Sequence, residues 1–138
     1  MTIEQINEQG QLRHLLTLAT LHQEQIRKII DKATTYLTPI GERPVHDTSL
    51  AGVTVANLFF EASTRTRASF ELAAKRLRAD VLNLDVNMSS RAKGESILDT
   101  IYTLQAMQID MFVVRDAGTG IPEEIAAHVE PHICVLSA

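Results

Sequence analysis

The amino-acid sequence predicts an α/β fold with a doubly wound parallel sheet of at least four strands and helices on both faces. Four apolar runs are expected to form strands, at residues 53–60, 81–86, 111–114 and 133–136. Segments with helical periodicity lie between them, at residues 69–77, 96–107 and 122–128. Strands that alternate with helices are typical of a parallel sheet. The runs are also apolar without alternation, as expected when both faces of a sheet are covered.

The N-terminal segment is expected to precede the domain itself. Residues 1–20 are predicted to be an N-terminal arm and a lead-in segment, and residues 21–138 a single domain. The first ten residues are polar and lack an apolar period. Four leucines are expected to dock the lead-in segment onto the domain: Leu12, Leu15, Leu16 and Leu18.

A first helix is predicted over residues 21–37, because apolar residues recur there at spacings of three and four. Thr20 and Gln23 fit a capping box at the start of this helix. A loop before the first strand is indicated by three residues that break helices: Pro39, Gly41 and Pro44.

Length and composition indicate one soluble globular domain. The chain has 138 residues, enough to bury roughly two-thirds of the surface of its unfolded form. No stretch approaches the about 20 apolar residues of a membrane-spanning helix, and the first residues lack a basic-then-apolar signal sequence. We therefore expect a cytoplasmic protein without a membrane partner. The net charge of −4 argues against nucleic acid as a partner, because binding to phosphate backbones needs a surplus of Lys and Arg.

Polar segments follow three of the predicted strands, at residues 63–67, 87–95 and 115–116. In open parallel sheets, ligands bind at the carboxyl ends of the strands. The predicted fold therefore gathers these three segments on one rim of the sheet.

The segment Ser63-Thr64-Arg65-Thr66-Arg67, which we call the cradle, concentrates hydroxyl and guanidinium groups directly after an apolar run. Ser and Thr offer hydroxyl donors, Arg offers a planar fork that matches phosphate oxygens, and a helix that begins there adds unpaired N–H groups. The pattern therefore predicts a site for a phosphate group. The alternative for the whole segment is a solvated loop with a helix cap. For Arg67, helical spacing also allows a turn away from the ligand toward Glu71 as an i,i+4 pair.

Two further cations and one acid lie on the predicted rim. Arg115 ends the third apolar run, where ligands of parallel sheets bind, and its alternative role is an ion pair with Asp116. Lys93 lies next to Gly94 in a polar segment, and on its residue type alone it is a solvated lysine. Glu61 is expected to form a structural or interdomain salt bridge, because neighbouring arginines keep it ionised.

Other patterns are not expected to form sites. The run at residues 118–123 begins like a dinucleotide fingerprint but lacks its third glycine, so a tight turn before Pro122 at a helix start explains it better. The five histidines show no metal-ligand spacing, and we expect neither a metal nor an organic cofactor. The single cysteine, Cys134, excludes an internal disulfide and is expected to be an inert core residue.

The same residues carry a resemblance to a known family. The stretch Phe60-Glu61-Ala62-Ser63-Thr64-Arg65-Thr66-Arg67, followed by Ser69-Phe70-Glu71, resembles the carbamoyl-phosphate signature of the aspartate and ornithine transcarbamoylases. The segment Lys93-Gly94-Glu95-Ser96, with Asp99 and Thr100, is similar to that of the aspartate branch. Arg115 matches an arginine of the family at the end of the third strand. The resemblance covers about residues 12–138.

The resemblance implies a role for each matching residue. Four would bind the phosphate of carbamoyl phosphate: Ser63, Thr64, Arg65 and Thr66. Arg65 would stabilise the departing phosphate, and Thr66 and Arg115 would reach the carbonyl oxygen. Ser89 and Lys93 would complete the site of an adjacent chain in a homotrimer, because the lysine loop of the family comes from the neighbouring subunit. Catalysis is thus assigned to Arg65, Thr66, Lys93 and Arg115.

The resemblance also implies a function, that of the carbamoyl-phosphate-binding half of an aspartate carbamoyltransferase. Such an enzyme converts carbamoyl phosphate and L-aspartate into N-carbamoyl-L-aspartate and phosphate in de novo pyrimidine synthesis. The second, aspartate-binding domain is expected to be missing from this chain, so the chain alone would be inactive and would expose an apolar patch. One alternative is the same half of an ornithine carbamoyltransferase. Another is a non-catalytic anion-binding or assembly module, with a dihydroorotase-like or regulatory chain as a further partner.

Overall fold

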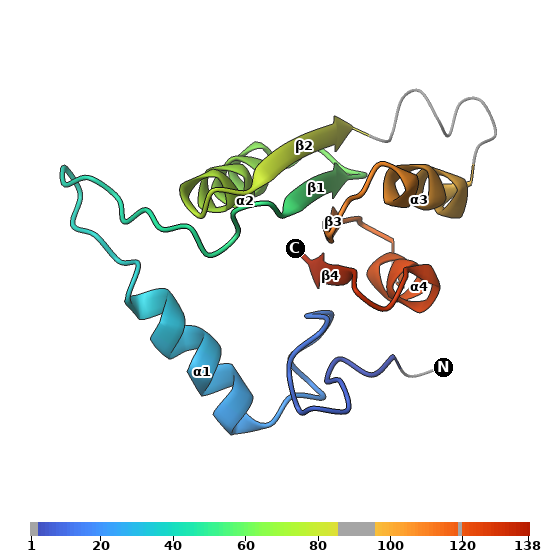
Figure 1. Cartoon of the computed structure of the whole chain (residues 1–138), viewed down its shortest axis with the longest axis horizontal. Helices are drawn as coiled ribbons and strands as arrows, with labels where there is room; N and C mark the ends of the chain where they lie inside the picture. Colours follow the sequence, from blue (N-terminus) through green and yellow to red (C-terminus); the bar gives the residue numbers. More distant parts are fainter. Residues whose placement is uncertain (1–2, 86–95, 119) are drawn as a thin grey trace.

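Four parallel strands alternate with helices along the chain. The computed structural model describes residues 3–85, 96–118 and 120–138. The strands are β1 (Thr54–Phe59), β2 (Asp80–Asp85), β3 (Met111–Arg115) and β4 (Cys134–Ser137). The helices are α1 (Gln23–Thr34), α2 (Thr64–Arg76), α3 (Ile97–Ala106) and α4 (Ile121–His128) (Figure 1). All strand pairs are parallel and their spatial order is β2-β1-β3-β4, which confirms the predicted α/β class.

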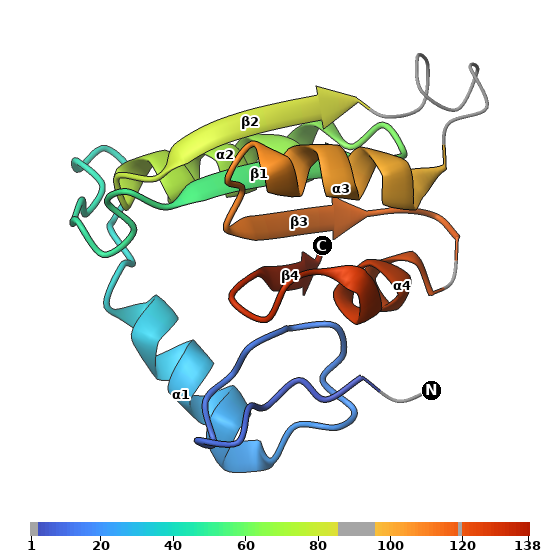
Figure 2. The same cartoon turned by 45° about the vertical axis from the view of Figure 1, so that its right-hand side comes forward.

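Side chains of β1 alternate between two buried layers, because successive residues of a strand point to opposite faces of its sheet. Ala56 and Leu58 belong to one cluster with Ile101 of α3 and Ile125 of α4. Val55 belongs to a second cluster with Ala74 of α2. Helices therefore cover both faces of the sheet, as predicted, with α2 on one face and α3 and α4 on the other (Figure 2).

Each strand begins and ends within one residue of its predicted run, whereas two helices differ from prediction at their starts. α2 begins at Thr64 and not at residue 69, so the cradle forms the first turn of a helix. The predicted capping box of Thr20 and Gln23 is wrong. The N-cap of α1 is His22, whose N–H donates to Gln25 Oε1 at 2.8 Å.

The N-terminal segment packs along β4. Gln5, which falls within the expected polar arm, is only 4% exposed. Its side-chain amide donates to the Thr17 carbonyl oxygen at 2.9 Å and to Thr20 Oγ1 at 2.7 Å, and this second bond explains why Thr20 does not cap α1. Leu15 pairs with the outer edge of β4, where its N–H donates to the Val135 carbonyl oxygen at 2.9 Å.

The predicted docking of the leucines holds in part. Leu16 is buried in the core with the side chains of α3 and α4, and Leu15 is half-buried. Leu12 and Leu18 are exposed. In the same segment the buried ring of His14 accepts a hydrogen bond at Nδ1 from the Val135 N–H at 3.0 Å.

Helix α1 stands apart from the sheet in both views (Figures 1 and 2). The structure describes this helix in full, and none of its residues is buried. Ile30 is 58% exposed, and Leu37 beyond its end is 78% exposed. None of the helices in the described part of the chain has the length and apolar character needed to span a membrane.

Candidate functional site

The strand order creates a switch point between β1 and β3. From β1 the chain passes through α2 to β2 on one side, and from β2 it passes through α3 to β3 on the other side of β1. In open α/β sheets, ligands bind where the connections diverge in this way, outside the carboxyl ends of the strands. The cradle after β1 and Arg115 at the end of β3 both lie at this point.

The start of α2 is open to an anion. Ser63 is the N-cap residue, with a non-helical backbone (φ −150°, ψ 83°), and its side chain makes no capping hydrogen bond to the described residues. The first helical hydrogen bond runs from the Arg67 N–H to the Ser63 carbonyl oxygen at 3.0 Å. The preceding N–H groups have no partner within the helix, and the first turn contains no acidic residue. No acidic side chain within the first turn therefore offsets the positive end of the helix dipole.

A small cavity of about 100 Å³ opens at the start of α2. Three of its lining residues belong to the cradle: Ser63, Thr64 and Arg67. Glu61 and Phe59 line it from the end of β1. Arg65 is exposed and Thr66 half-buried, and neither lines this cavity, although both were predicted with the others. From the sequence, two roles are open for Arg67, contact with a ligand and a pair with Glu71. In the structure Arg67 lines the cavity.

Arg115 is tied to the end of β1 by two contacts. Its Nε donates to Glu61 Oε1 at 2.8 Å, and its carbonyl oxygen accepts from the Phe60 N–H at 2.8 Å. The two charged side chains are 35% and 33% exposed, so the ion pair borders solvent. The expected salt bridge of Glu61 therefore forms within this domain, with Arg115 as its partner.

Residues 13–138 match the carbamoyl-P binding domain of the aspartate/ornithine carbamoyltransferases. The chain belongs to this family.

Solved structures of carbamoyltransferases share the fold of this carbamoyl-phosphate-binding domain. The catalytic subunit of aspartate transcarbamoylase from M. jannaschii is 32% identical, with a TM-score of 0.75 over 91% of this chain and 40% of that chain. Aspartate transcarbamoylase from Trypanosoma cruzi, solved with carbamoyl phosphate, is 31% identical, with a TM-score of 0.73 over 90% of this chain and 39% of that chain.

An ornithine enzyme matches almost as well. The anabolic ornithine carbamoyltransferase from Campylobacter jejuni is 28% identical, with a TM-score of 0.75 over 92% of this chain and 39% of that chain. The chain therefore spans about 40% of the length of these carbamoyltransferases.

Two predicted residues of the carbamoyl-phosphate site, Ser89 and Lys93, lie outside the described residues, and their roles stay predictions. The described chain resumes at Ser96, the N-cap of α3.

The chain turns tightly before α4. Gly120 precedes this helix in a left-handed conformation (φ 87°), and Pro122 lies in the first turn of the helix. This confirms the tight turn predicted in place of a dinucleotide fingerprint.

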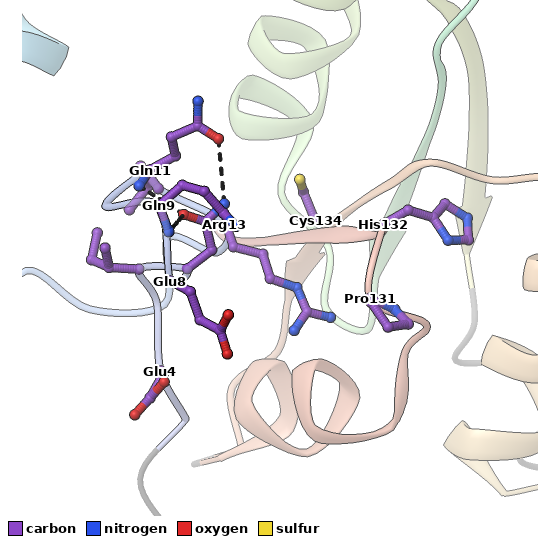
Figure 3. Close-up of a pocket in the computed structure, with 11 residues that line it drawn as sticks. Glu4, Glu8, Gln9, Gln11, Arg13, Pro131, His132 and Cys134 are labelled. Atoms are coloured by element: carbon purple, nitrogen blue, oxygen red, sulfur yellow. Dashed lines mark hydrogen bonds between the residues drawn. The ribbon is translucent and has the colours of Figure 1, made fainter.

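A larger cavity of about 580 Å³ lies between the N-terminal segment and the start of β4 (Figure 3). Arg13 reaches across it, and its Nη2 donates to the Glu130 carbonyl oxygen at 3.1 Å. The half-buried thiol of Cys134 borders it, and burial raises the pKa of that thiol. Sequence reasoning missed this cavity because its walls are far apart along the chain. It lies at the amino end of β4, whereas parallel sheets bind ligands at carboxyl ends.

Proposed function

We propose that the cradle binds carbamoyl phosphate and that this domain is the carbamoyl-phosphate half of an aspartate carbamoyltransferase. The observation that carries the proposal is the uncapped start of α2 at the switch point of the sheet. An uncapped helix start offers oriented N–H groups and a positive dipole end, which are the groups that hold phosphates in many proteins.

The reaction places negative charge at two positions. The α-amine of L-aspartate attacks the carbonyl carbon of carbamoyl phosphate, and the bond from that carbon to the phosphate oxygen breaks. Charge develops on the carbonyl oxygen, for which Thr66 and Arg115 are the proposed donors. The leaving phosphate accepts hydrogen bonds from Ser63, Thr64 and Arg65 in this proposal.

The ion pair with Glu61 supports the role of Arg115. A guanidinium group carries five N–H donors in a fixed plane, and the bond from Nε to Glu61 uses one of them. This bond orients the plane of the group at the end of β3. The terminal nitrogens of Arg115 would then meet the carbonyl oxygen of the substrate.

Three further parts of the proposal concern the whole enzyme. Ser89 and Lys93 of an adjacent subunit in a homotrimer would complete each site. Because the chain spans about 40% of the related enzymes, a second domain would supply the aspartate site, and the chain alone would bind without turnover. Closure of that domain would hold the two anionic substrates together in a cytoplasmic step of pyrimidine synthesis.

The aspartate branch is favoured over the ornithine branch by Lys93-Gly94-Glu95 and by a small difference in sequence identity. Amino-acid specificity would reside mainly in the second domain. Carbamoyl transfer assays with that domain present, comparing L-aspartate with L-ornithine as acceptor, decide between the branches. Transfer to L-ornithine alone would reassign the domain to the ornithine enzymes.

Calorimetry with carbamoyl phosphate tests the cradle directly. Arg65→Ala removes one charge-assisted pair, so affinity is expected to fall by about 10- to 100-fold. Arg27→Ala on the exposed surface of α1 is the matched control, because it removes the same charge away from the rim. Equal affinity of the Arg65→Ala variant and the unmodified chain would refute the assignment.

A further inference from the structure

The pairing of β1 with β3 continues one residue past the end of β1. Phe60 follows this strand, and its N–H donates to the Arg115 carbonyl oxygen at 2.8 Å. The bond extends the parallel ladder in which Phe59 is the register partner of Arg115. Phe60 therefore holds the backbone of Arg115 at the point where the chain leaves the sheet for the cradle.

The residue after Phe60 holds the side chain of Arg115. Glu61 Oε1 accepts from Arg115 Nε at 2.8 Å. Both charged side chains are partly exposed, so water competes for this ion pair, and the pair by itself fixes the guanidinium group only weakly. Two consecutive residues thus contact Arg115, one at its carbonyl oxygen and one at its guanidinium group. The precision of both contacts depends on how firmly residues 60 and 61 are held.

Two buried aromatic rings anchor this stretch of chain on opposite faces of the sheet. Phe59 is 1% exposed, and Phe60 is 4% exposed. Phe60 belongs to the core cluster that contains Ile101 of α3 and Ile125 of α4. Phe59 lines the cavity at the start of α2, which covers the other face. Each buried ring contributes a large contact area, so the end of β1 is fixed from both sides.

The cluster that contains Phe60 also extends to the starts of two helices. Ile97 and Ile121 are the first residues of α3 and α4, and both are partly buried against this cluster. Each of these helices follows a strand of the sheet, so the cluster lies beneath the rim that carries the candidate site. Phe60 connects this packing to the residues that contact Arg115.

We propose that Phe60 is a positioning residue for Arg115, which it holds through the backbone bond to the Arg115 carbonyl oxygen and by placing Glu61 beside the guanidinium group. The inference rests on the proposed binding of carbamoyl phosphate, in which Arg115 meets the carbonyl oxygen of the ligand. Phe60 does not touch the ligand in this proposal. A smaller side chain at position 60 leaves a gap in the core, and the end of β1 shifts to fill it.

Phe60→Leu, compared with Phe112→Leu, separates positioning from stability. Phe112 is the matched control because it is 0% exposed in the same cluster but lies near the amino end of β3, away from the rim. Both variants leave a small cavity, so both melting temperatures are expected to fall by several degrees. Calorimetry below both transitions is expected to show about tenfold weaker binding of carbamoyl phosphate to Phe60→Leu, because an oriented donor is displaced. Phe112→Leu should bind as the unmodified chain does.

A double-mutant cycle with Arg115→Ala tests whether Phe60 acts through Arg115. If Phe60 serves to position this side chain, Phe60→Leu should have almost no further effect on affinity once the guanidinium group is gone. A general loosening of the domain would instead weaken binding by the same factor with and without Arg115. Equal factors in the two backgrounds would overturn the inference, as would equal affinities of Phe60→Leu and Phe112→Leu.

Phe60→Met is the second variant if the leucine variant does not fold, because methionine fills more of the space of the ring with a flexible side chain. It is expected to weaken binding severalfold, and unchanged affinity would also overturn the inference. Failure of the unmodified chain to bind carbamoyl phosphate would instead refute the proposed function, and this inference with it. Binding that Arg65→Ala and Arg115→Ala weaken, while the variants of Phe60 do not, would refute the positioning role alone.

Discussion

Helices α2 and α3 both follow a strand of the sheet and both have serine as N-cap, yet their first turns differ. In α3, Ser96 Oγ accepts from the Asp99 N–H at 3.1 Å, and the Asp99 carboxylate accepts from the Ser96 N–H at 3.2 Å. In α2, Ser63 makes no capping bond to the described residues, and the position equivalent to Asp99 is Thr66. Within the described part of the chain, Ser96 and Asp99 cap the start of α3, whereas the Ser63 side chain does not cap α2.

We interpret the capped start of α3 as structural and the start of α2 as the proposed binding site. A capping side chain typically stabilises a helix by about 0.5–2 kcal/mol, so an uncapped start is a cost to the free protein. A bound anion would supply the missing acceptors and the missing negative charge. The N-cap residue is serine at both starts, so the residue at the third helical position makes the difference, Asp99 in α3 and Thr66 in α2.

The largest expected effect comes from giving α2 the first turn of α3. Thr66→Asp would create the capping box that α3 has, with a carboxylate where the phosphate is proposed to bind. Like charges at close range cost several kcal/mol, so affinity for carbamoyl phosphate should fall by more than about 100-fold. The melting temperature should rise by about 2–4 °C, because the helix gains a cap. Calorimetry measures the affinity, and thermal unfolding measures the melting temperature. Unchanged affinity of the Thr66→Asp variant would show that the first turn of α2 does not hold the phosphate.

The stability of the fold should also depend on pH through His14, a side chain that accepts a hydrogen bond from the backbone as Ser96 does. His14 Nδ1 accepts from the Val135 N–H, and burial, followed by the charge of Arg13, lowers the pKa of His14 to about 4. The unfolded chain binds this proton below about pH 6.5, so stability is complete above that pH and is lost as the pH falls toward 4. The full loss is on the order of 3 kcal/mol.

Urea unfolding at pH 7 and at pH 4.5 measures this acid effect. His14→Gln should flatten the profile between these values, whereas His46→Gln, at an exposed position, should keep it. Asp47, whose pKa is lowered to about 2 by hydrogen bonds from Ser49 and Tyr36, loses its contribution only at more acidic pH. An unchanged acid response in His14→Gln would show that another group is responsible.

The smallest effect is expected from matched serine substitutions at the two N-caps. Ser96→Ala should lower the free energy of unfolding by about 1 kcal/mol, because the Asp99 N–H loses its acceptor. Ser63→Ala should leave stability almost unchanged and should weaken carbamoyl phosphate binding by a few-fold. Denaturant unfolding and calorimetry on both variants test the contrast. Equal losses of stability would mean that Ser63 caps its helix after all.

Much of the fold can be predicted from the sequence, because apolar runs without alternation are typical of strands that are covered on both faces. Residues such as Phe112, Val113 and Val114 are all buried, and such runs locate the strands to within one residue. The cradle and Arg115 could be assigned to one rim for the same reason, since a parallel sheet brings strand ends together.

Other features depend on contacts that local patterns do not reveal. Periodicity alone places the start of α2 five residues late, because apolar periodicity begins only at Phe70 and the first turn is polar. The local pattern misplaces the cap of α1 because Gln5, which is 15 residues away in the chain, binds Thr20. The hydrogen bond from Asn57 to Asn83 joins two strands, so no single segment indicates it.

The pairing of the N-terminal segment with β4 bears on how the chain folds during synthesis. His14 and Val135 are separated by 121 residues, so this contact closes a very long loop. Ribosomes add about 5–20 residues per second, so residues 14–16 wait roughly 6–24 s for their partner strand. The other three strands can associate in that interval, which makes the docking of the first segment one of the last steps of folding.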